Sequence, residues 1–153
     1  MNNIPSWKFW IFKWWFLPAA GFMGVRLVHL TDVECKTSLR LSWRNKNPFR
    51  SQYFAAQAAA AEMATGLPAF QLMRMKGQSI SMLITGMEAV FLKKATGVVE
   101  FTCYDVQVIK DAIQEALAQD AQAVQVKVAV DAIQLSDAEV VSTFIFNWSF
   151  KKR

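Results

Sequence analysis

Residues 47–66 have the sequence NPFRSQYFAAQAAAAEMATG, a pattern typical of a loop followed by a helix and its end. Asn47 or Ser51 is suited to cap the N-terminus of this helix, because a short polar side chain accepts a hydrogen bond from a free backbone amide. Gly66 and the nearby Pro68 favour a helix end, since glycine adopts the left-handed conformation and proline cannot continue the hydrogen-bond ladder. We therefore predict a helix that ends near Gly66.

Small side chains make up most of this predicted helix. Its alanines are Ala55, Ala56, Ala58, Ala59, Ala60, Ala61 and Ala64. A helix with so little side-chain volume allows another surface to approach its backbone closely. One carboxylate, Glu62, stands among these alanines, and a lone acid in such surroundings is either solvated or takes part in chemistry.

Composition favours one well-packed domain. The chain has 153 residues, of which 54% are hydrophobic and 13% aromatic, and this is enough for a substantial core. Cys35 and Cys103 lie in apolar alternating runs and are predicted to be buried thiols of a reducing compartment. His29 is the single histidine and there is no Cys/His cluster, so we expect no metal site.

The chain is basic, with a formal net charge of +5. Such a charge is compatible with phosphates, acidic lipids or nucleic acid as partners. We do not predict nucleic-acid binding, because it calls for a dense basic stripe with a known motif. The only basic cluster is the C-terminal sequence Lys151-Lys152-Arg153.

Residues 1–24 form an aromatic, helical segment ahead of a predicted core at residues 25–153. This segment contains four of the six tryptophans, Trp7, Trp10, Trp14 and Trp15. The apolar run at residues 14–25 is 12 residues long, whereas a helix that spans a bilayer needs about 20. Two interpretations stay open: an aromatic helix packed over the open side of the domain, or a peripheral membrane anchor with Trp and Lys at the lipid headgroups. In both, the segment is placed to control access of an apolar ligand.

The rest of the chain contains many strand patterns and few helical ones. Strands are predicted at residues 25–31, 33–44, 69–76, 78–86, 87–94, 97–104, 123–133 and 139–150. Asp105 is suited to cap a second, amphipathic helix. The apolar side of that helix carries Val106, Ile109, Ile113 and Leu117. Many strands joined by short turns indicate an antiparallel α+β fold.

Residues 33–44 show the clearest strand pattern. One face of this strand is predicted to carry Val33, Cys35, Thr37, Leu39, Leu41 and Trp43. The other face carries charged residues and serines. This alternation predicts a strand with one buried and one solvated face.

The order of these elements resembles the hotdog fold, in which an antiparallel sheet wraps around one long central helix. The resemblance covers nearly the whole chain from about Gly21, and residues 91–97, FLKKATG, look like the family's strand-to-turn segment. Among hotdog proteins the chain is most similar to the acyl-CoA thioesterase branch. It is more similar still to a subgroup catalogued as a domain of unknown function, in which sequences of the SQYFA type occur.

The thioesterase branch has an Asn, then His-Gly-Gly at the helix start, then a carboxylate on the helix. Asn47 falls at the Asn, Tyr53-Phe54-Ala55 at His-Gly-Gly, and Glu62 at the catalytic acid. The resemblance implies that Glu62 activates water or attacks the thioester carbonyl, and that the amides of Phe54 or Ala55 stabilise the oxyanion. It also implies that Asn47 positions substrate or water. Burial beside an acyl chain would raise the pKa of Glu62 towards the range of a general base.

Two departures from the branch pattern keep other functions open. Phe54 and Ala55 lack the conformational freedom of a Gly-Gly pair, and Tyr53 replaces a positioning histidine while keeping a hydroxyl donor. Gln57 either lines the site or lies on the helix surface, and Glu62 could instead pair with a basic residue of another subunit. The alternative function is a non-catalytic protein that binds acyl chains or lipid.

The resemblance also implies a substrate, a location and an assembly. We expect an acyl-CoA or acyl-carrier thioester with a medium or long chain, no cofactor, and a cytoplasmic homodimer or dimer of dimers. The phosphates of CoA would be bound by Arg74, Lys76, Lys93 and Lys94. Solvated lysines at strand edges are the commoner explanation for these residues.

Overall fold

The computed structural model describes residues 11, 13–76, 79–119 and 122–153. Its helices are α2 (Pro18–Met23), α3 (Phe54–Lys76) and α4 (Val106–Ala118). Its strands are β1 (Arg26–Leu30), β2 (Cys35–Arg40), β3 (Ile80–Phe91), β4 (Val98–Cys103), β5 (Val124–Gln134) and β6 (Glu139–Lys152). The strands form one sheet in the order β1-β2-β4-β5-β6-β3, in which every neighbouring pair is antiparallel.

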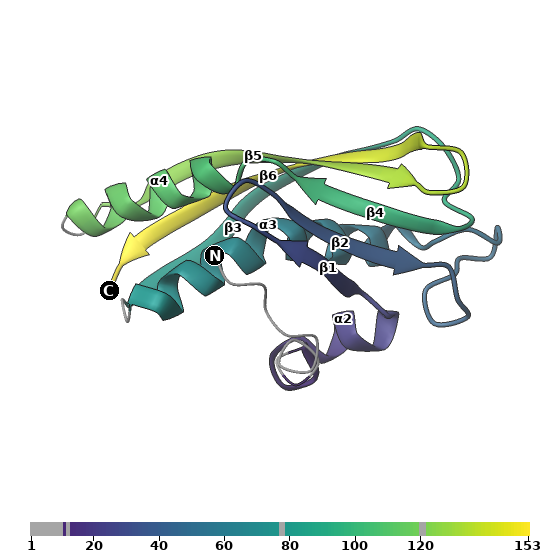
Figure 1. Ribbon diagram of the computed structural model, residues 1–153, viewed down its shortest axis with the longest axis horizontal. Helices are drawn as coiled ribbons and strands as arrows, with labels where there is room; N and C mark the ends of the chain where they lie inside the picture. Colours follow the sequence, from purple (N-terminus) through teal and green to yellow (C-terminus); the bar gives the residue numbers. More distant parts are fainter. Residues whose placement is uncertain (1–10, 12, 77–78, 120–121) are drawn as a thin grey trace.

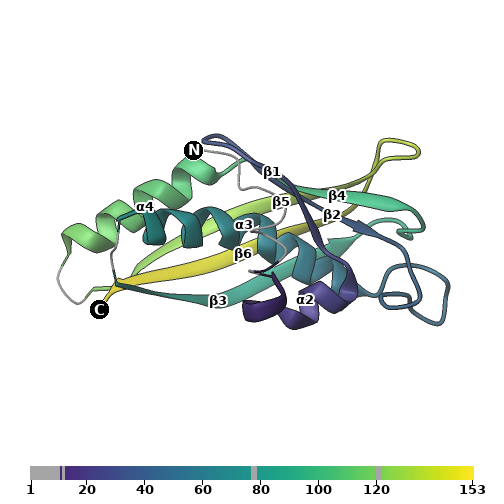
Figure 2. The same cartoon turned by 60° about the horizontal axis from the view of Figure 1, so that its bottom comes forward.

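The long helix α3 lies along one face of this sheet, with α4 beside it and α2 between the β1 and β3 sides of the molecule (Figures 1 and 2). Alanines of α3 such as Ala60, Ala61 and Ala64 are completely buried. The sheet contributes large aromatic rings to the same core, among them Phe101, Phe144, Phe146 and Phe150. Small residues on the helix and large ones on the sheet therefore complement each other, as the alanine content predicted.

Helix α3 is longer than predicted. It continues past Gly66 and Pro68 to residue 76, so the predicted strand at residues 69–76 is wrong. Proline inside a helix removes one hydrogen bond and costs about 3 kcal/mol. Here Leu67 and Ala69 on either side of it are buried in the core. Tertiary packing of this segment thus overrides the local helix-ending sequence.

The two strands predicted at residues 78–86 and 87–94 form the single strand β3, which pairs with β6 along its whole length. The register shifts between Ile84 and Gly86. A Cβ atom at Gly86 would lie 2.8 Å from Nδ2 of Asn147 on the neighbouring strand. Gly86 therefore permits close contact within a continuous strand and does not end one.

The strand predicted at residues 33–44 is shorter in the structure. Cys35 and Leu39 are fully buried in β2, as the alternation predicted. Val33 and Trp43, beyond the strand ends, are instead 69% and 73% exposed. Residue Asp105 precedes α4 but does not cap it with its side chain, because the carboxylate accepts a hydrogen bond from the amide of Ala129 in β5.

The described part of the N-terminal segment packs against the core. Residues 13–16 are helical, and the ring of Phe16 lies 6.4 Å from that of Phe70 in α3. Nζ of the buried Lys13 donates a hydrogen bond to the carbonyl of Val25. Trp7 and Trp10 lie outside the described residues. No helix in the described part of the chain has the length and hydropathy needed to cross a bilayer.

Candidate functional site

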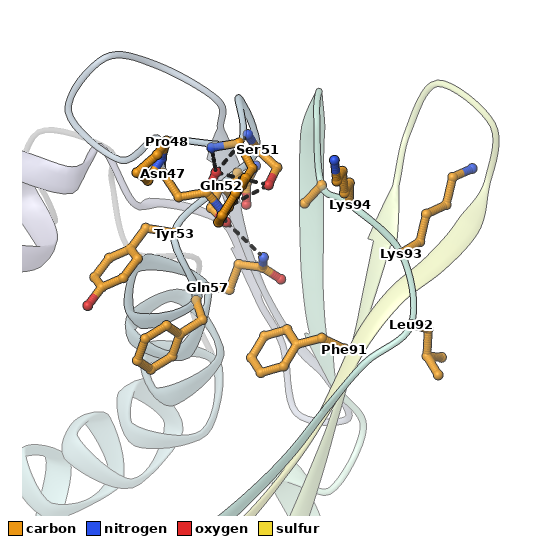
Figure 3. A pocket seen from close by; sticks show the side chains of 13 residues that line it. Asn47, Pro48, Ser51, Gln52, Tyr53, Gln57, Phe91, Leu92, Lys93 and Lys94 are labelled. Atoms are coloured by element: carbon orange, nitrogen blue, oxygen red, sulfur yellow. Dashed lines mark hydrogen bonds between the residues drawn. The ribbon is translucent and has the colours of Figure 1, made fainter.

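The loop before α3 is held by the side chain of Asn47. Its Oδ1 accepts hydrogen bonds from the amides of Phe49 and Ser51, and its Nδ2 donates to Oγ of Ser51 and to the carbonyl of Gln52. The two side chains predicted to cap the helix therefore stabilise the loop, and α3 starts later, at Phe54. Figure 3 shows these contacts as dashed lines.

The first amides of α3 are free donors. The amides of Ala56 and Gln57 both donate to the carbonyl of Tyr53. Within the described residues, no acceptor lies in hydrogen-bond range of the amides of Phe54 and Ala55. Such unpaired amides at a helix N-terminus favour negative charge, as does the helix dipole. The structure thus leaves unpaired the two amides to which the sequence resemblance assigns an oxyanion role, and that role stays a prediction.

A cavity of about 530 Å³ opens at this helix start. Residues predicted for the site that line it are Asn47, Tyr53, Phe54, Gln57, Lys93 and Lys94. The ring of Phe91 points across the cavity towards α3 (Figure 3). It lies 6.4 Å from the ring of Phe54. We call this the helix-start cavity.

Gln57 lines this cavity with a buried side chain. Its Oε1 accepts a 2.8 Å hydrogen bond from Oγ of Ser142 in β6, and its Nε2 lies 3.5 Å from the carbonyl of Gln52. Of the two positions left open for Gln57, the structure has the lining one. Ser142 was missed from the sequence, because it sits in an apolar strand without any motif that links it to the helix.

Glu62 lines a second, smaller cavity of about 190 Å³, which we call the carboxylate cavity. Its other walls are Phe16, Leu17, Met63, Gly66, Leu67, Phe70 and Met82. Burial among these residues raises the pKa of Glu62 to about 7. Within the described residues, no donor or cation contacts the carboxylate. Glu62 is therefore a carboxyl group poised to gain or lose a proton near neutral pH.

Gly66 gives the Glu62 side chain its space. A Cβ atom at Gly66 would lie 2.9 Å from Oε1 of Glu62 and 3.7 Å from the ring of Trp148. Nε1 of Trp148 donates to Oγ1 of Thr65, and Thr65 donates to the carbonyl of Glu62. These contacts fix the helix turn that carries the carboxylate. Residues four apart on a helix are neighbours, so Gly66 lies beside Glu62. The sequence prediction missed this contact because it ended the helix at Gly66.

The two cavities are separated along α3 within one chain. Glu62 follows Phe54 by eight residues, which at 1.5 Å per residue corresponds to about 12 Å along the helix axis. A thioester carbonyl extends over only a few ångströms. Within one protomer, the helix start and Glu62 therefore line different cavities, about 12 Å apart along the helix axis.

The four basic residues predicted to bind phosphate do not form one cluster. Lys93 pairs with Asp137 at 2.8 Å and with Glu139, and its side chain points away from the loop at residues 47–52 (Figure 3). Arg74 lies over the ring of Phe70, 5.8 Å from its centroid, near the end of α3. Lys93 lies instead at the cavity beside the start of that helix. Lys76 is the last residue of α3, and its side chain is not among the described parts of the structure. Only Lys93 and Lys94 line the helix-start cavity.

The described residues contain no group of three or more His, Cys, Asp or Glu side chains that could hold a metal ion. The thiols of Cys35 and Cys103 are buried opposite each other on β2 and β4. Burial raises the pKa of Cys103 to about 12, which keeps this thiol protonated. Glu62 and the helix-start amides are the candidate groups for chemistry that remain in the described residues.

A long central helix packed against one face of a six-stranded antiparallel sheet defines a hotdog-fold protein. Residues 8–148 match the family described as Domain of unknown function (DUF4442), and the chain belongs to that family. The resemblance noted in the sequence is thereby confirmed. A search of curated proteins finds no match.

Solved structures share the fold at low sequence identity. A protein of unknown function from Chlorobaculum tepidum has 13% identity and a TM-score of 0.80, over 97% of this chain and 94% of its own. A thioesterase from Haemophilus influenzae has 10% identity and a TM-score of 0.69, over 99% and 93%. A variant of a thioesterase from Pseudomonas aeruginosa has 11% identity and a TM-score of 0.69, over 99% and 98%. The hotdog fold predicted from the sequence is confirmed.

Proposed function

We propose that the protein is a thioesterase that hydrolyses an acyl-CoA or acyl-carrier thioester. The observation that carries this proposal is the Glu62 carboxylate, buried in an apolar cavity and with a pKa near 7. A general base works best when its pKa lies near the working pH. Thioesterases among the solved structures of the same fold support the same reaction class.

In the proposed reaction, Glu62 takes a proton from water while the water oxygen forms a bond to the thioester carbonyl carbon. The negative charge that develops on the carbonyl oxygen is stabilised by the amides of Phe54 and Ala55. The carbon–sulfur bond then breaks, and the thiolate leaves with the proton that Glu62 had taken. The products are a carboxylic acid and a thiol. Direct attack by Glu62 on the carbonyl is the other route open to the same residue.

We propose that the two parts of the site come from two subunits of a homodimer. The support is the separation of about 12 Å between the helix start and Glu62 within one chain. Strand β3 lies at the edge of the sheet and exposes apolar side chains, including Leu83, Met87 and Val90. An apolar edge strand favours pairing with a second copy. Such a dimer can place Glu62 of one protomer near the helix start of its partner.

A role for Asn47 in contacting the substrate has less support than a role in positioning the loop, because loop hydrogen bonds already occupy both polar atoms of its side chain. Gln57 lines the helix-start cavity and is proposed to bind the acyl-carrier part of the substrate. The apolar walls around Glu62 favour an acyl chain on that side.

One observation favours the alternative of a non-catalytic acyl-binding protein. The ring of Phe54 lines the cavity at the position where the thioesterase branch has glycine. A phenylalanine there occupies space that a carbonyl group would need next to the amides.

Thiol release from acyl-CoA thioesters of increasing chain length tests the proposal, with the wild-type protein compared with Glu62→Gln. The glutamine keeps the shape of the side chain but cannot accept the proton. We expect turnover by the wild type and a loss of about 10²–10⁴-fold in the variant. Glu115→Gln, on the exposed surface of α4, is the matched control. Binding without turnover by the wild type would establish the acyl-binding alternative.

A further inference from the structure

The N-terminal helical turn exposes apolar side chains and buries a charged one, which is the reverse of an ordinary surface helix. Ile11, Trp14 and Trp15, spaced i, i+3 and i+4, are 52%, 43% and 80% exposed. Lys13, between them in sequence, is 8% exposed and donates from Nζ to the carbonyl of Val25. Contact with water does not stabilise the side of a helix that exposes tryptophans, and here the lysine of the helix is buried.

The exposed aromatic surface extends onto α2 and the loop after β2. Trp14 packs against Gly21, since a Cβ atom there would lie 3.4 Å from the tryptophan ring. The next residue, Phe22, is half exposed and meets the 73% exposed Trp43 edge to face, with 5.9 Å between the ring centroids. We define the aromatic face as Ile11, Trp14, Trp15, Phe22 and Trp43. Figure 2 shows α2 on the outside of the molecule, in front of α3.

Two arginines lie on the same side of the molecule as this aromatic face. The sequence contains no Asp or Glu before Asp32, and none between Glu34 and Glu62. Burial lowers the pKa of Lys13, and the charges of the nearby Arg26 and Arg44 lower it further. In the described part of the chain, neither arginine forms an ion pair. Exposed aromatic rings and uncompensated arginines therefore occupy one region.

We propose that the aromatic face docks on a lipid surface with anionic headgroups. Tryptophan is enriched at membrane interfaces, because its ring is apolar and its N–H is polar, and amphipathic helices insert their apolar side there. Anionic lipids attract nearby arginines by about 1 kcal/mol each, which corresponds to about fivefold in affinity. A second copy on this face is disfavoured, because a two-fold contact would set the basic region against itself.

Docking in this manner has a consequence that rests on the proposed function. Phe16 and Leu17, adjacent to the aromatic face, form walls of the carboxylate cavity. A protein bound through this face would hold that cavity at the lipid surface, where acyl chains with amphipathic carriers gather. The docking itself does not depend on catalysis, so the two proposals can fail separately.

The test is co-sedimentation of the full chain with phosphatidylcholine vesicles that contain or lack phosphatidylserine. We expect binding to the anionic vesicles that weakens as salt is raised. The double variant Trp15→Ser/Trp43→Ser should bind at least about tenfold more weakly. Arg26→Gln/Arg44→Gln should lose about fivefold for each arginine. Tyr104→Ser, 61% exposed near the start of α4, and Lys127→Gln on β5 are matched controls that should bind like the wild type.

Three outcomes would overturn the proposal. The first is no binding to the anionic vesicles, and the second is wild-type binding by the tryptophan variant. The third is a fall in the mass of the protein in solution when Trp15 and Trp43 are replaced, which would show that a second copy covers the face. Circular dichroism melting verifies that the variants fold. Thiol release from a soluble short-chain acyl-CoA, unchanged in these variants, separates docking from catalysis.

Discussion

The two cavities along α3 differ in their effect on negatively charged groups. The helix-start cavity is lined by a hydrogen-bonded loop, and the first amides of α3 favour negative charge there. The carboxylate cavity is small and walled by apolar side chains, and only this burial brings the pKa of Glu62 to about 7. One helix thus carries amides that favour negative charge at its start and, two turns further on, a carboxyl group that burial keeps protonated up to about neutral pH.

Mixing two defective chains gives the largest expected effect, because it tests whether the regions act across subunits. Ala55→Pro removes one amide donor in the first turn of α3, where that amide makes no hydrogen bond within the helix. We expect Ala55→Pro and Glu62→Gln each to lose about 10²-fold or more in turnover. In a mixed dimer one site carries both defects and the other carries neither. Random mixing should therefore restore about one quarter of the wild-type activity.

Thiol release after unfolding and refolding the two chains together measures this recovery. The control is each variant refolded alone, which should stay inactive. Absence of recovery, with mixed dimers demonstrated by mass, would mean that the two regions do not complement each other across subunits.

The pH dependence of stability tests the burial of Glu62. Its pKa is raised from 4.5 to about 7 in the folded protein, so the folded state prefers the protonated carboxyl group. This preference contributes stability below about pH 4.5, and the contribution is lost as the pH rises through 7. We expect the free energy of unfolding to fall by roughly 2–3 kcal/mol from this group over that interval.

Urea unfolding of the wild type and Glu62→Gln over a pH series isolates this contribution, because other titrating groups cancel in the difference. The difference in the free energy of unfolding should change between pH 4.5 and 7.5. A constant difference would mean that Glu62 titrates normally and that its cavity does not prepare it as a base.

Replacing Gly66 tests the difference between the two cavities, because it should disturb only the carboxylate cavity. In Gly66→Ala the added Cβ would lie 2.9 Å from Oε1 of Glu62, at the movable end of a flexible side chain. The carboxylate should shift, with a loss of about tenfold in kcat/KM. Stability should change by less than about 1 kcal/mol, because alanine is favoured over glycine within a helix. Steady-state kinetics and thermal unfolding provide the two readouts.

Gly97→Ala is the matched control for this substitution. Its added Cβ would lie 3.8 Å from the nearest atoms, an ordinary contact with Gln134. Activity should therefore stay at the wild-type level. An equal loss in both variants would place the effect in the general fold and not at Glu62.

Much of this arrangement could be predicted from the sequence, because its patterns are local. The alternation in β2, the alanines of α3 and the apolar side of α4 each reflect burial on one face of an element. The end of α3 could not be predicted in this way. Pro68 lies in a helix because the core surrounds it, and that information comes from distant strands.

The same difference between local patterns and distant contacts applies to the candidate site. Phe54, Ala55 and Glu62 were predicted as site residues from a motif contained in one stretch of sequence. Ser142 and Trp148 reach the helix from β6, more than 80 residues away along the chain. The basic residues were expected on strands or turns near the helix, but Arg74 lies within α3 itself and is separated from Lys93.

Removing the hydroxyl group of Ser142 gives the smallest expected effect on the carboxylate cavity and tests whether the two regions are independent within one chain. In Ser142→Ala the buried Oε1 of Gln57 loses its donor, which should cost about 1–2 kcal/mol in the free energy of unfolding. Ser149→Ala, a partly exposed position on the same strand, should cost less. The pH at which the stability contribution of Glu62 changes should stay the same, since Gln57 lines the helix-start cavity and not the carboxylate cavity. A shift of that pH in Ser142→Ala would mean that the regions are coupled through β6 and α3, and a site within one subunit would then have to be considered again.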